Sequence, residues 1–241
     1  MNKTLPWLAL VVAASSASVF AEDKPAEDKV WSGEVNLGYI QSAGNSNSTS
    51  FNGKSKAIHD GENWRTTAKV EGANESSDDV RSTEKYFASL KEDYKLNDKS
   101  YLFGLLEHTI DRYSGYDYES SITFGYGREL IKNERHKLSA DIGVGYRRSN
   151  VEDSHDVEEE SVGRLGAVYN WIINENTTFD EEASTEIGND KTVSKSLTRV
   201  KVKINGNLWG SVAYEIKRTS NVPVGVKNSD RTTTVGLNYT F

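Results

Sequence analysis

Apolar and polar residues alternate along most of the chain, and the pattern is clearest in the segment that ends it. There, every second position is apolar: Val235, Leu237, Tyr239 and Phe241. The positions between them are small or polar: Thr234, Gly236, Asn238 and Thr240. Successive side chains of a β-strand point to opposite faces, so this period of two predicts a strand with one apolar face. In a membrane barrel the apolar face meets lipid and the other faces the lumen.

The same period recurs often enough to predict an all-β protein. His136–Ser149 is a second clear example, with Leu138, Ile142 and Val144 on one face. Twelve such segments are expected, at roughly 30–41, 49–59, 63–73, 81–95, 100–111, 117–129, 136–149, 162–173, 178–187, 194–204, 208–218 and 229–241. An even number suits a transmembrane antiparallel up-and-down β-barrel with both termini in the periplasm. A ten- or fourteen-stranded barrel and a soluble β protein remain as alternatives.

Connection lengths and tryptophans support the barrel. Short turns with Asn or Asp, such as Asp60-Gly61 and Asn205-Gly206, alternate with longer polar connections, of which Asn150–Ser161 is an example. Outer-membrane barrels have short periplasmic turns and longer external loops. Four tryptophans fall at predicted periplasmic strand ends, where an aromatic belt is expected: Trp31, Trp64, Trp171 and Trp209.

The amino terminus predicts export. Residues 1–21 combine Lys3, an apolar stretch and a small-residue end at Ala21, which is the pattern of a cleaved secretory signal peptide. Residues 22–29 form a short charged periplasmic lead-in, and 30–241 form one barrel domain. The expected location is the outer membrane, in contact with its lipid and lipopolysaccharide. We expect the barrel-assembly machinery to recognise the last strand through Phe241.

Composition narrows the chemistry. The chain contains no cysteine, which excludes disulfides, thiolate metal sites and cysteine nucleophiles. Its 36 acidic residues outnumber 29 basic ones, which argues against nucleic acid as a partner. No later stretch is long and apolar enough for a membrane helix. We expect no cofactor.

Charges on the last strands predict a ladder inside the lumen. A turn centred near Asp190-Lys191 makes strands 178–187 and 194–204 antiparallel partners. Three pairs of opposite charge then face each other: Asp180 with Lys201, Glu182 with Arg199, and Glu186 with Lys195. Such pairs fix register and contribute roughly 0.2–1 kcal/mol each. The ladder either braces a hydrated wall or lines a conduction path.

Two other groups of residues are weak candidates for chemistry. The acidic loop Asn150–Ser161 offers oxygen ligands for a divalent cation, but it lacks EF-hand spacing and is better explained as a solvated external loop. A hydrolase triad is conceivable from His108, Asp111 and either Ser114 or Ser120, but no flanking motif supports it.

One motif at the predicted external rim carries a family resemblance. The motif is Asp111, Arg112, Tyr113, Ser114, Gly115, Tyr116 and Asp117, followed by Gly125–Arg128, Asn133–Leu138 and Gly143–Tyr146. With these segments the chain resembles the YdiY-like salt-induced outer-membrane protein family, over essentially the whole mature chain. The resemblance implies an outer-membrane barrel of unknown function and brings no catalytic residues. The rim motif itself is either a gate at the mouth or a tyrosine cluster at the membrane interface.

The leading hypothesis is therefore a narrow porin-like channel for ions or small polar solutes, without a chemical step. A closed structural or surface-interaction barrel with acidic external loops is the alternative. A barrel-embedded hydrolase is the third.

Overall fold

The computed structural model describes residues 31–42, 48–77, 80–112, 114–152, 154–223 and 226–241. The predicted signal peptide and lead-in lie outside these residues. The described chain is built from strands: β1 (Trp31–Ser42), β2 (Ser48–Asp60), β3 (Trp64–Ser77), β4 (Val80–Lys95), β5 (Ser100–Asp111), β6 (Tyr116–Lys132), β7 (His136–Val151), β8 (Val157–Asn174), β9 (Thr177–Gly188), β10 (Thr192–Asn205), β11 (Leu208–Thr219) and β12 (Ser229–Thr240). None of the described residues belongs to a helix long and apolar enough to cross a membrane.

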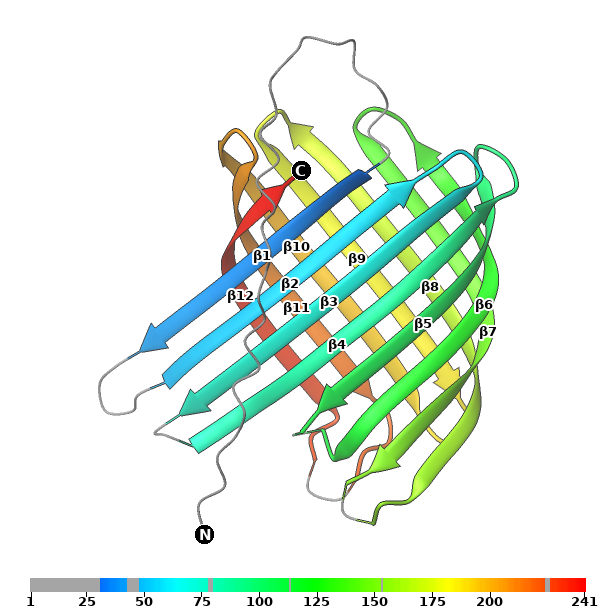
Figure 1. Ribbon diagram of the computed structural model, residues 1–241, viewed down its shortest axis with the longest axis vertical. Helices are drawn as coiled ribbons and strands as arrows, with labels where there is room; N and C mark the ends of the chain where they lie inside the picture. The colour runs from blue at the N-terminus through cyan, green and yellow to red at the C-terminus, as the bar shows by residue number, and fades with distance from the viewer. Residues whose placement is uncertain (1–30, 43–47, 78–79, 113, 153, 224–225) are drawn as a thin grey trace.

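Each strand pairs antiparallel with the next, and β1 pairs with β12 to close the ring (Figure 1). The prediction of a twelve-stranded up-and-down barrel is confirmed. The start of β1, the carboxy terminus and the short turns lie together at what we call the turn end, uppermost in Figure 1. The opposite end, which carries the remaining connections, is the loop end.

The two faces of each strand are as different as the alternation predicts. On β12, Val235 and Leu237 are more than half exposed on the outer wall, whereas Thr234 and Asn238 are buried inside. Asn238 accepts a hydrogen bond from Asn36 of β1 at 2.8 Å. An apolar outer wall with a hydrogen-bonded interior is the arrangement that lipid on one side and water on the other select.

The four tryptophans of the described strands lie at the turn end, three on the outer wall and one facing inward. Trp31, Trp64 and Trp171 are exposed on the outer wall, where they suit a membrane interface. Trp209 pairs with Asn238 in the inward register, and its ring lies under the Lys203 ammonium at 5.8 Å. The prediction that Trp209 joins the belt was wrong, because β11 enters the sheet with this position turned inward.

Strand β5 is apolar on both faces because part of the lumen wall is packed with rings. Tyr101, Phe103 and Leu105 form a buried cluster on its inner face. A Cβ atom at Gly127 of β6 would overlap the Tyr101 ring, and one at Gly125 would press on Phe103. Glycine is required at both positions so that the rings can lie against the neighbouring backbone.

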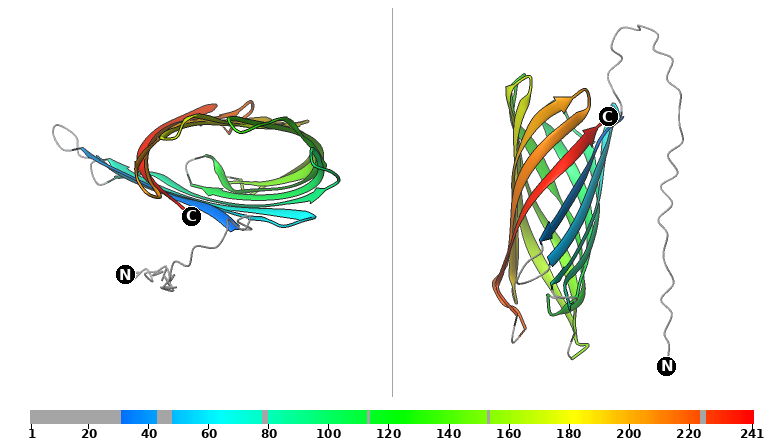
Figure 2. Two further views of the ribbon diagram at one scale, coloured as in Figure 1. Left: turned by 90° about the horizontal axis from the view of Figure 1, so that it is seen from above. Right: turned by 90° about the vertical axis from the view of Figure 1, so that its left-hand side faces the viewer.

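The barrel is a flattened oval rather than a circular cylinder (Figure 2). Twelve strands spaced about 4.8 Å apart and tilted by about 40° would form a circle about 24 Å across, measured between backbones. A lysine and a glutamate together span roughly half of that distance. Flattening therefore brings side chains from opposite walls within reach of each other.

Connections at the loop end are shorter than predicted. Strands β7 and β8 extend to Val151 and Val157, so most of the predicted loop Asn150–Ser161 is strand. Strands β3 and β4 likewise extend into the gap between the predicted segments 63–73 and 81–95, reaching Ser77 and Val80. On β7 and β8 the charged positions stay in the strands, where Arg147 pairs with Glu160 inside the barrel and Arg148 with Glu159 outside it.

Candidate functional site: the charged lumen

The register of the predicted ladder was wrong by two residues. Asp180 lies opposite Arg199, where Lys201 was expected; Glu182 faces Leu197, and Glu186 faces Val193. The β9–β10 turn is centred between Asn189 and Asp190, because the Gly188 N–H donates to the carbonyl of Lys191. The observed turn is thus centred one residue before the predicted position.

The six ladder residues nevertheless all take part in interior ion pairs. Arg199 contacts Asp180 at 3.1 Å and Glu34 of β1 at 2.6 Å. Lys201 contacts the same two carboxylates, at 3.3 and 2.9 Å. These four side chains make a closed cluster near the turn end, which ties β9 and β10 to the strand that begins the barrel.

Glu182 reaches across the lumen. Its carboxylate contacts Lys69 of β3 at 2.5 Å and Lys56 of β2 at 3.4 Å. Strands β9 and β3 are six places apart in a ring of twelve, so they stand on opposite walls. We call Glu182, Lys56 and Lys69 the mid-lumen bridge. It is the contact that the flattened cross-section makes possible.

Further contacts cross the lumen nearer the loop end. Lys195 of β10 meets Glu107 of β5 at 3.3 Å, and Lys217 of β11 meets Glu119 of β6 at 3.1 Å. The partners in each case lie five places apart around the ring. The interior is thus spanned by ion pairs at several heights.

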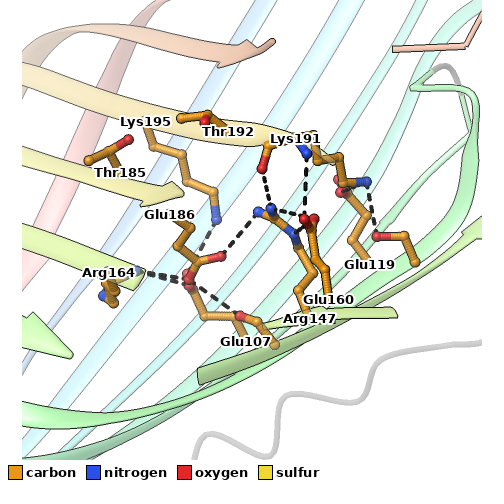
Figure 3. A network of polar contacts seen from close by, with 12 residues as sticks. Glu107, Glu119, Arg147, Glu160, Arg164, Thr185, Glu186, Lys191, Thr192 and Lys195 are labelled. Carbon is orange, nitrogen blue, oxygen red and sulfur yellow. Dashed lines mark hydrogen bonds and ion pairs between the residues drawn. The ribbon is translucent and has the colours of Figure 1, made fainter. Parts of the chain in front are cut away.

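A buried network stands beside these crossings (Figure 3). Arg147 of β7 donates to Glu160 at 2.7 Å and to the carbonyl of Lys191 at 2.7 Å, and it pairs with Glu186 at 3.4 Å. The Lys191 ammonium contacts Glu119 at 3.0 Å. We call Arg147, Glu160, Glu186, Lys191 and Glu119 the outer network. Through it the β9–β10 turn is fastened inside the loop end.

Between the bridge and the outer network lies a cavity of about 240 Å³. Its lining carries charges of both signs and one phenylalanine. Among the lining residues are Lys69, Glu182, Glu107, Lys195, Arg164 and Phe87. A volume of this size accommodates several waters or one small solute. The cavity offers hydrogen-bond donors, acceptors and both signs of charge.

The rim motif forms the β5–β6 turn. The Ser114 hydroxyl donates to the carbonyl of Asp111 at 2.8 Å, and Gly115 has a φ of 78°, which favours glycine. Gly115 packs so closely on Pro223 and Val226 of the β11–β12 connection that a Cβ atom would crowd both. Two connections from distant strands therefore meet over the mouth.

The other members of the motif point in different directions. Arg112 contacts Glu84 at 3.3 Å, and Asp117 is exposed. Tyr116 is buried, with its ring 3.5 Å from the Lys191 ammonium. Tyr113 lies outside the described residues. The motif thus contributes both to the turn and, through Tyr116, to the surroundings of the outer network.

The geometry does not assemble the hydrolase triad. His108 contacts the Ser120 hydroxyl at 2.8 Å, but on the outer wall. Asp111 belongs to the inward register of β5, on the other face of the sheet from His108. Within the described ranges, histidine, aspartate and glutamate side chains form no group of three or more placed to hold a metal ion.

The acidic residues that follow the β7–β8 connection form ion pairs with basic side chains. Glu159 contacts Arg148 on the outer wall at 3.7 Å, and Glu158 contacts Lys191 at 3.7 Å. Glu160 belongs to the outer network. The run of acidic residues predicts a solvated loop, whereas Glu158, Glu159 and Glu160 lie in β8 and have basic partners.

Fold and interior define the class: the protein is an outer-membrane-type β-barrel with a charged lumen. The fold is similar to that of the NanC porin, with a TM-score of 0.53 and 12% identity over 86% of this chain and 98% of that one. The translocator domain of autotransporter NalP from Neisseria meningitidis gives a TM-score of 0.49 at 13% identity, covering 88% of each chain.

Sequence comparison gives the family. Residues 35–241 match the family described as "Protein of unknown function, DUF481", and the chain belongs to it. It is 30% identical to the uncharacterized protein YdiY of Escherichia coli (strain K12), over 99% of this chain and 98% of that protein. The resemblance noted from the rim motif is confirmed.

Proposed function

We propose that the protein is a narrow outer-membrane channel for ions or small polar solutes, whose aperture is set by the mid-lumen bridge. The observation that carries this is the contact of Glu182 with Lys69 and Lys56 across the lumen. Its three side chains are 22–34% exposed, so water reaches them. A partly hydrated ion pair exchanges partners more readily than a fully buried one, because water can replace the missing partner. A passing ion can therefore replace one partner at a time.

Orientation and targeting belong to the same proposal. The turn end faces the periplasm and the loop end faces outward, as the short turns favour. Residues 1–21 are removed on export, and residues 22–29 remain as a lead-in. Phe241 pairs with Gly33 through reciprocal backbone hydrogen bonds of 3.1 Å, so the terminal residue that the assembly machinery would read also closes the barrel.

Planar-bilayer recordings test the proposal. The refolded mature barrel should give discrete conductance steps, and Glu182→Gln should give larger ones because the neutral amide holds the two lysines less firmly. We expect an increase of about twofold, since one of several crossings is weakened. Glu181→Gln is the matched control. Glu181 is next to Glu182 in the chain, but its carboxylate lies on the outer wall, where it accepts hydrogen bonds from Ser196 and Thr198. This control should conduct like the wild type.

A silent barrel would overturn the proposal. The test is meaningful only for protein that shows the heat-modifiable gel shift of a folded barrel. Equal conductance of the wild type and Glu182→Gln would remove the bridge from any role in the aperture. Larger steps in Glu181→Gln would show that the variants act through the wall and not through the lumen.

A closed structural barrel is the second candidate, favoured by the outer network and by the contact of Gly115 with Pro223 and Val226 over the mouth. In that case both the wild type and Glu182→Gln insert into bilayers and stay silent. The network would then serve to anchor the loop end for contacts with other envelope components.

A further inference from the structure

The barrel is closed by a seam that is paired over only half of its height. The ladder between β1 and β12 runs from Glu34↔Thr240 to Gly38↔Gly236. Strand β12 begins at Ser229, well before Gly236, and there it is paired with β11 alone among the described strands. The loop-end parts of β1 and β2 project past the oval in Figure 2. Among the described residues, β12 therefore has no partner on its β1 side from Ser229 to Val235, and we call this stretch the free edge.

Alternation of the ladder shows which backbone groups lie on that edge. Gly33 and Phe241 exchange both of their hydrogen bonds, so Phe241 turns its N–H and C=O toward β1. In an antiparallel ladder every second residue does the same. The backbone groups of Val235, Thr233 and Arg231 thus point to the unpaired side. Their side chains belong to the outward register that Val235 shares with Tyr239.

Two arginines lie beside this edge on the outer wall. Arg231 is opposite Ile216 of β11, and Arg218 is opposite Ser229, so the two are diagonal neighbours on one face. Both are exposed. Neither guanidinium has a carboxylate within 4 Å in the part of the chain that the structure describes, although most interior basic residues do. Two neighbouring positive charges without a counter-ion repel each other, and an anion between them removes that repulsion.

We propose that Arg218, Arg231 and the free edge of β12 bind the phosphate group of a lipid in the outer leaflet. The guanidinium groups supply charge-assisted donors, and the N–H groups of Arg231 and Thr233 supply further donors on the same side. The carbonyl groups of the edge accept hydrogen bonds from hydroxyls or amides of a glycolipid headgroup. Unpaired backbone is costly next to hydrocarbon, so a polar headgroup also stabilises the seam.

A lipid is favoured over a soluble phosphate because of what lies beside the arginines. Val212, Tyr214 and Val235 are exposed on the outer wall along β11 and β12, on the turn-end side of the pair. Acyl chains attached to a bound headgroup would run along this apolar wall. The site lies on the outer wall and is independent of conduction through the lumen.

The first experiment measures binding of bisphosphorylated lipid A to the refolded mature barrel in zwitterionic micelles by native mass spectrometry. Arg218→Gln/Arg231→Gln should bind about a hundredfold more weakly, at about tenfold for each guanidinium removed. Arg128→Gln is the matched control, because Arg128 is an exposed arginine of β6 near the turn end. It should bind like the wild type, and all three exchanges should leave the folded gel shift unchanged.

Two further arms assign the source of the phosphate. Dephosphorylated lipid A should bind as weakly to the wild type as the intact lipid binds to the double variant, and inorganic phosphate should displace the lipid only at far higher concentration. Equal binding of the dephosphorylated lipid, or displacement by inorganic phosphate at matching concentration, would overturn the lipid-phosphate site. So would wild-type affinity in the double variant.

A cysteine pair tests the free edge itself, since the chain has no native cysteine. Leu37 and Leu237 are opposite each other in the paired half, so Leu37→Cys/Leu237→Cys should oxidise to a disulfide. Tyr39→Cys/Val235→Cys would be the next equivalent pair if the ladder continued. It should stay reduced. Complete oxidation of this second pair would show a closed seam, and co-purification of another protein's strand on it would replace lipid as the occupant.

Discussion

The outer network and the mid-lumen bridge use the same chemistry at two depths of burial. Side chains of Arg147 and Glu160 are 3% and 5% exposed, whereas those of Glu182 and Lys69 are 22% and 28% exposed. Arg147 also holds a backbone carbonyl, so its position is fixed by a turn as well as by charge. The bridge connects only side chains, from walls that are not neighbours in the sheet.

This difference indicates different roles. A buried ion pair contributes little net stability over an apolar substitute, but removing one partner leaves an uncompensated charge. Moving or substituting a member of the outer network therefore lowers the free energy of unfolding substantially. A partly hydrated pair has water to replace a missing partner. The outer network is suited to holding the loop end in one shape. The bridge is suited to opening when an ion passes.

Removing Arg147 should produce the largest effect. Arg147→Met leaves Glu160 and Glu186 buried without their common partner, and we expect unfolding to become easier by about 3–5 kcal/mol. Urea unfolding in detergent, followed by the gel shift, measures this. Arg148→Met is the control, since Arg148 is half exposed on the outer wall and its removal should cost about 0.5 kcal/mol or less. A similar loss of stability in both variants would show that burial does not determine how much each arginine contributes.

Glu182→Gln should have a smaller effect on stability. Because water reaches the bridge, we expect the free energy of unfolding to fall by about 1 kcal/mol or less in the same measurement. The larger conductance expected of this variant would then accompany a nearly unchanged fold. A decrease comparable to that of Arg147→Met would place the bridge with the structural contacts instead.

Ionic strength should distinguish the bridge from the outer network, with the smallest effect of the three predictions. Raising ionic strength from about 0.1 M to 1 M shortens the Debye length from about 10 Å to 3 Å and weakens exposed pairs more than buried ones. Conductance of the wild type should therefore rise faster than the conductivity of the solution, while Glu182→Gln should follow it in proportion. Parallel curves for the two proteins would show that the bridge does not limit flow.

Alternation alone predicted most of the fold. The outward positions of the last strand, from Val235 to Phe241, are the exposed ones, and the predicted bounds of β5, 100–111, match Ser100–Asp111. Lipid on one side and a hydrated interior on the other impose this period on every strand, so a single sequence contains it many times. The belt position of Trp209 failed because the period of two that places Val212 and Tyr214 on the outer wall turns residue 209 inward.

Contacts between distant strands could not be predicted in the same way. The β9–β10 register depended on where one turn is centred, and that turn is held by contacts of Lys191 with distant strands, such as the one with Glu119. The contact of Glu182 with Lys69 depends on the oval cross-section, which is a property of the whole ring. The half-paired seam likewise depends on how β1 and β12 meet, which the ten strands between them determine. None of these leaves a local pattern in the chain.

Cross-linking inside the lumen tests the central claim most directly, namely that opposite walls approach each other at Glu182 and Lys69. In the otherwise cysteine-free chain, Lys69→Cys/Glu182→Cys should be joined efficiently by a short bismaleimide in the folded barrel. Lys69→Cys/Glu181→Cys, in which the second thiol lies on the outer wall, should not be joined. Equal yields from the two pairs, or none from the first, would contradict an approach of the two walls at Lys69 and Glu182.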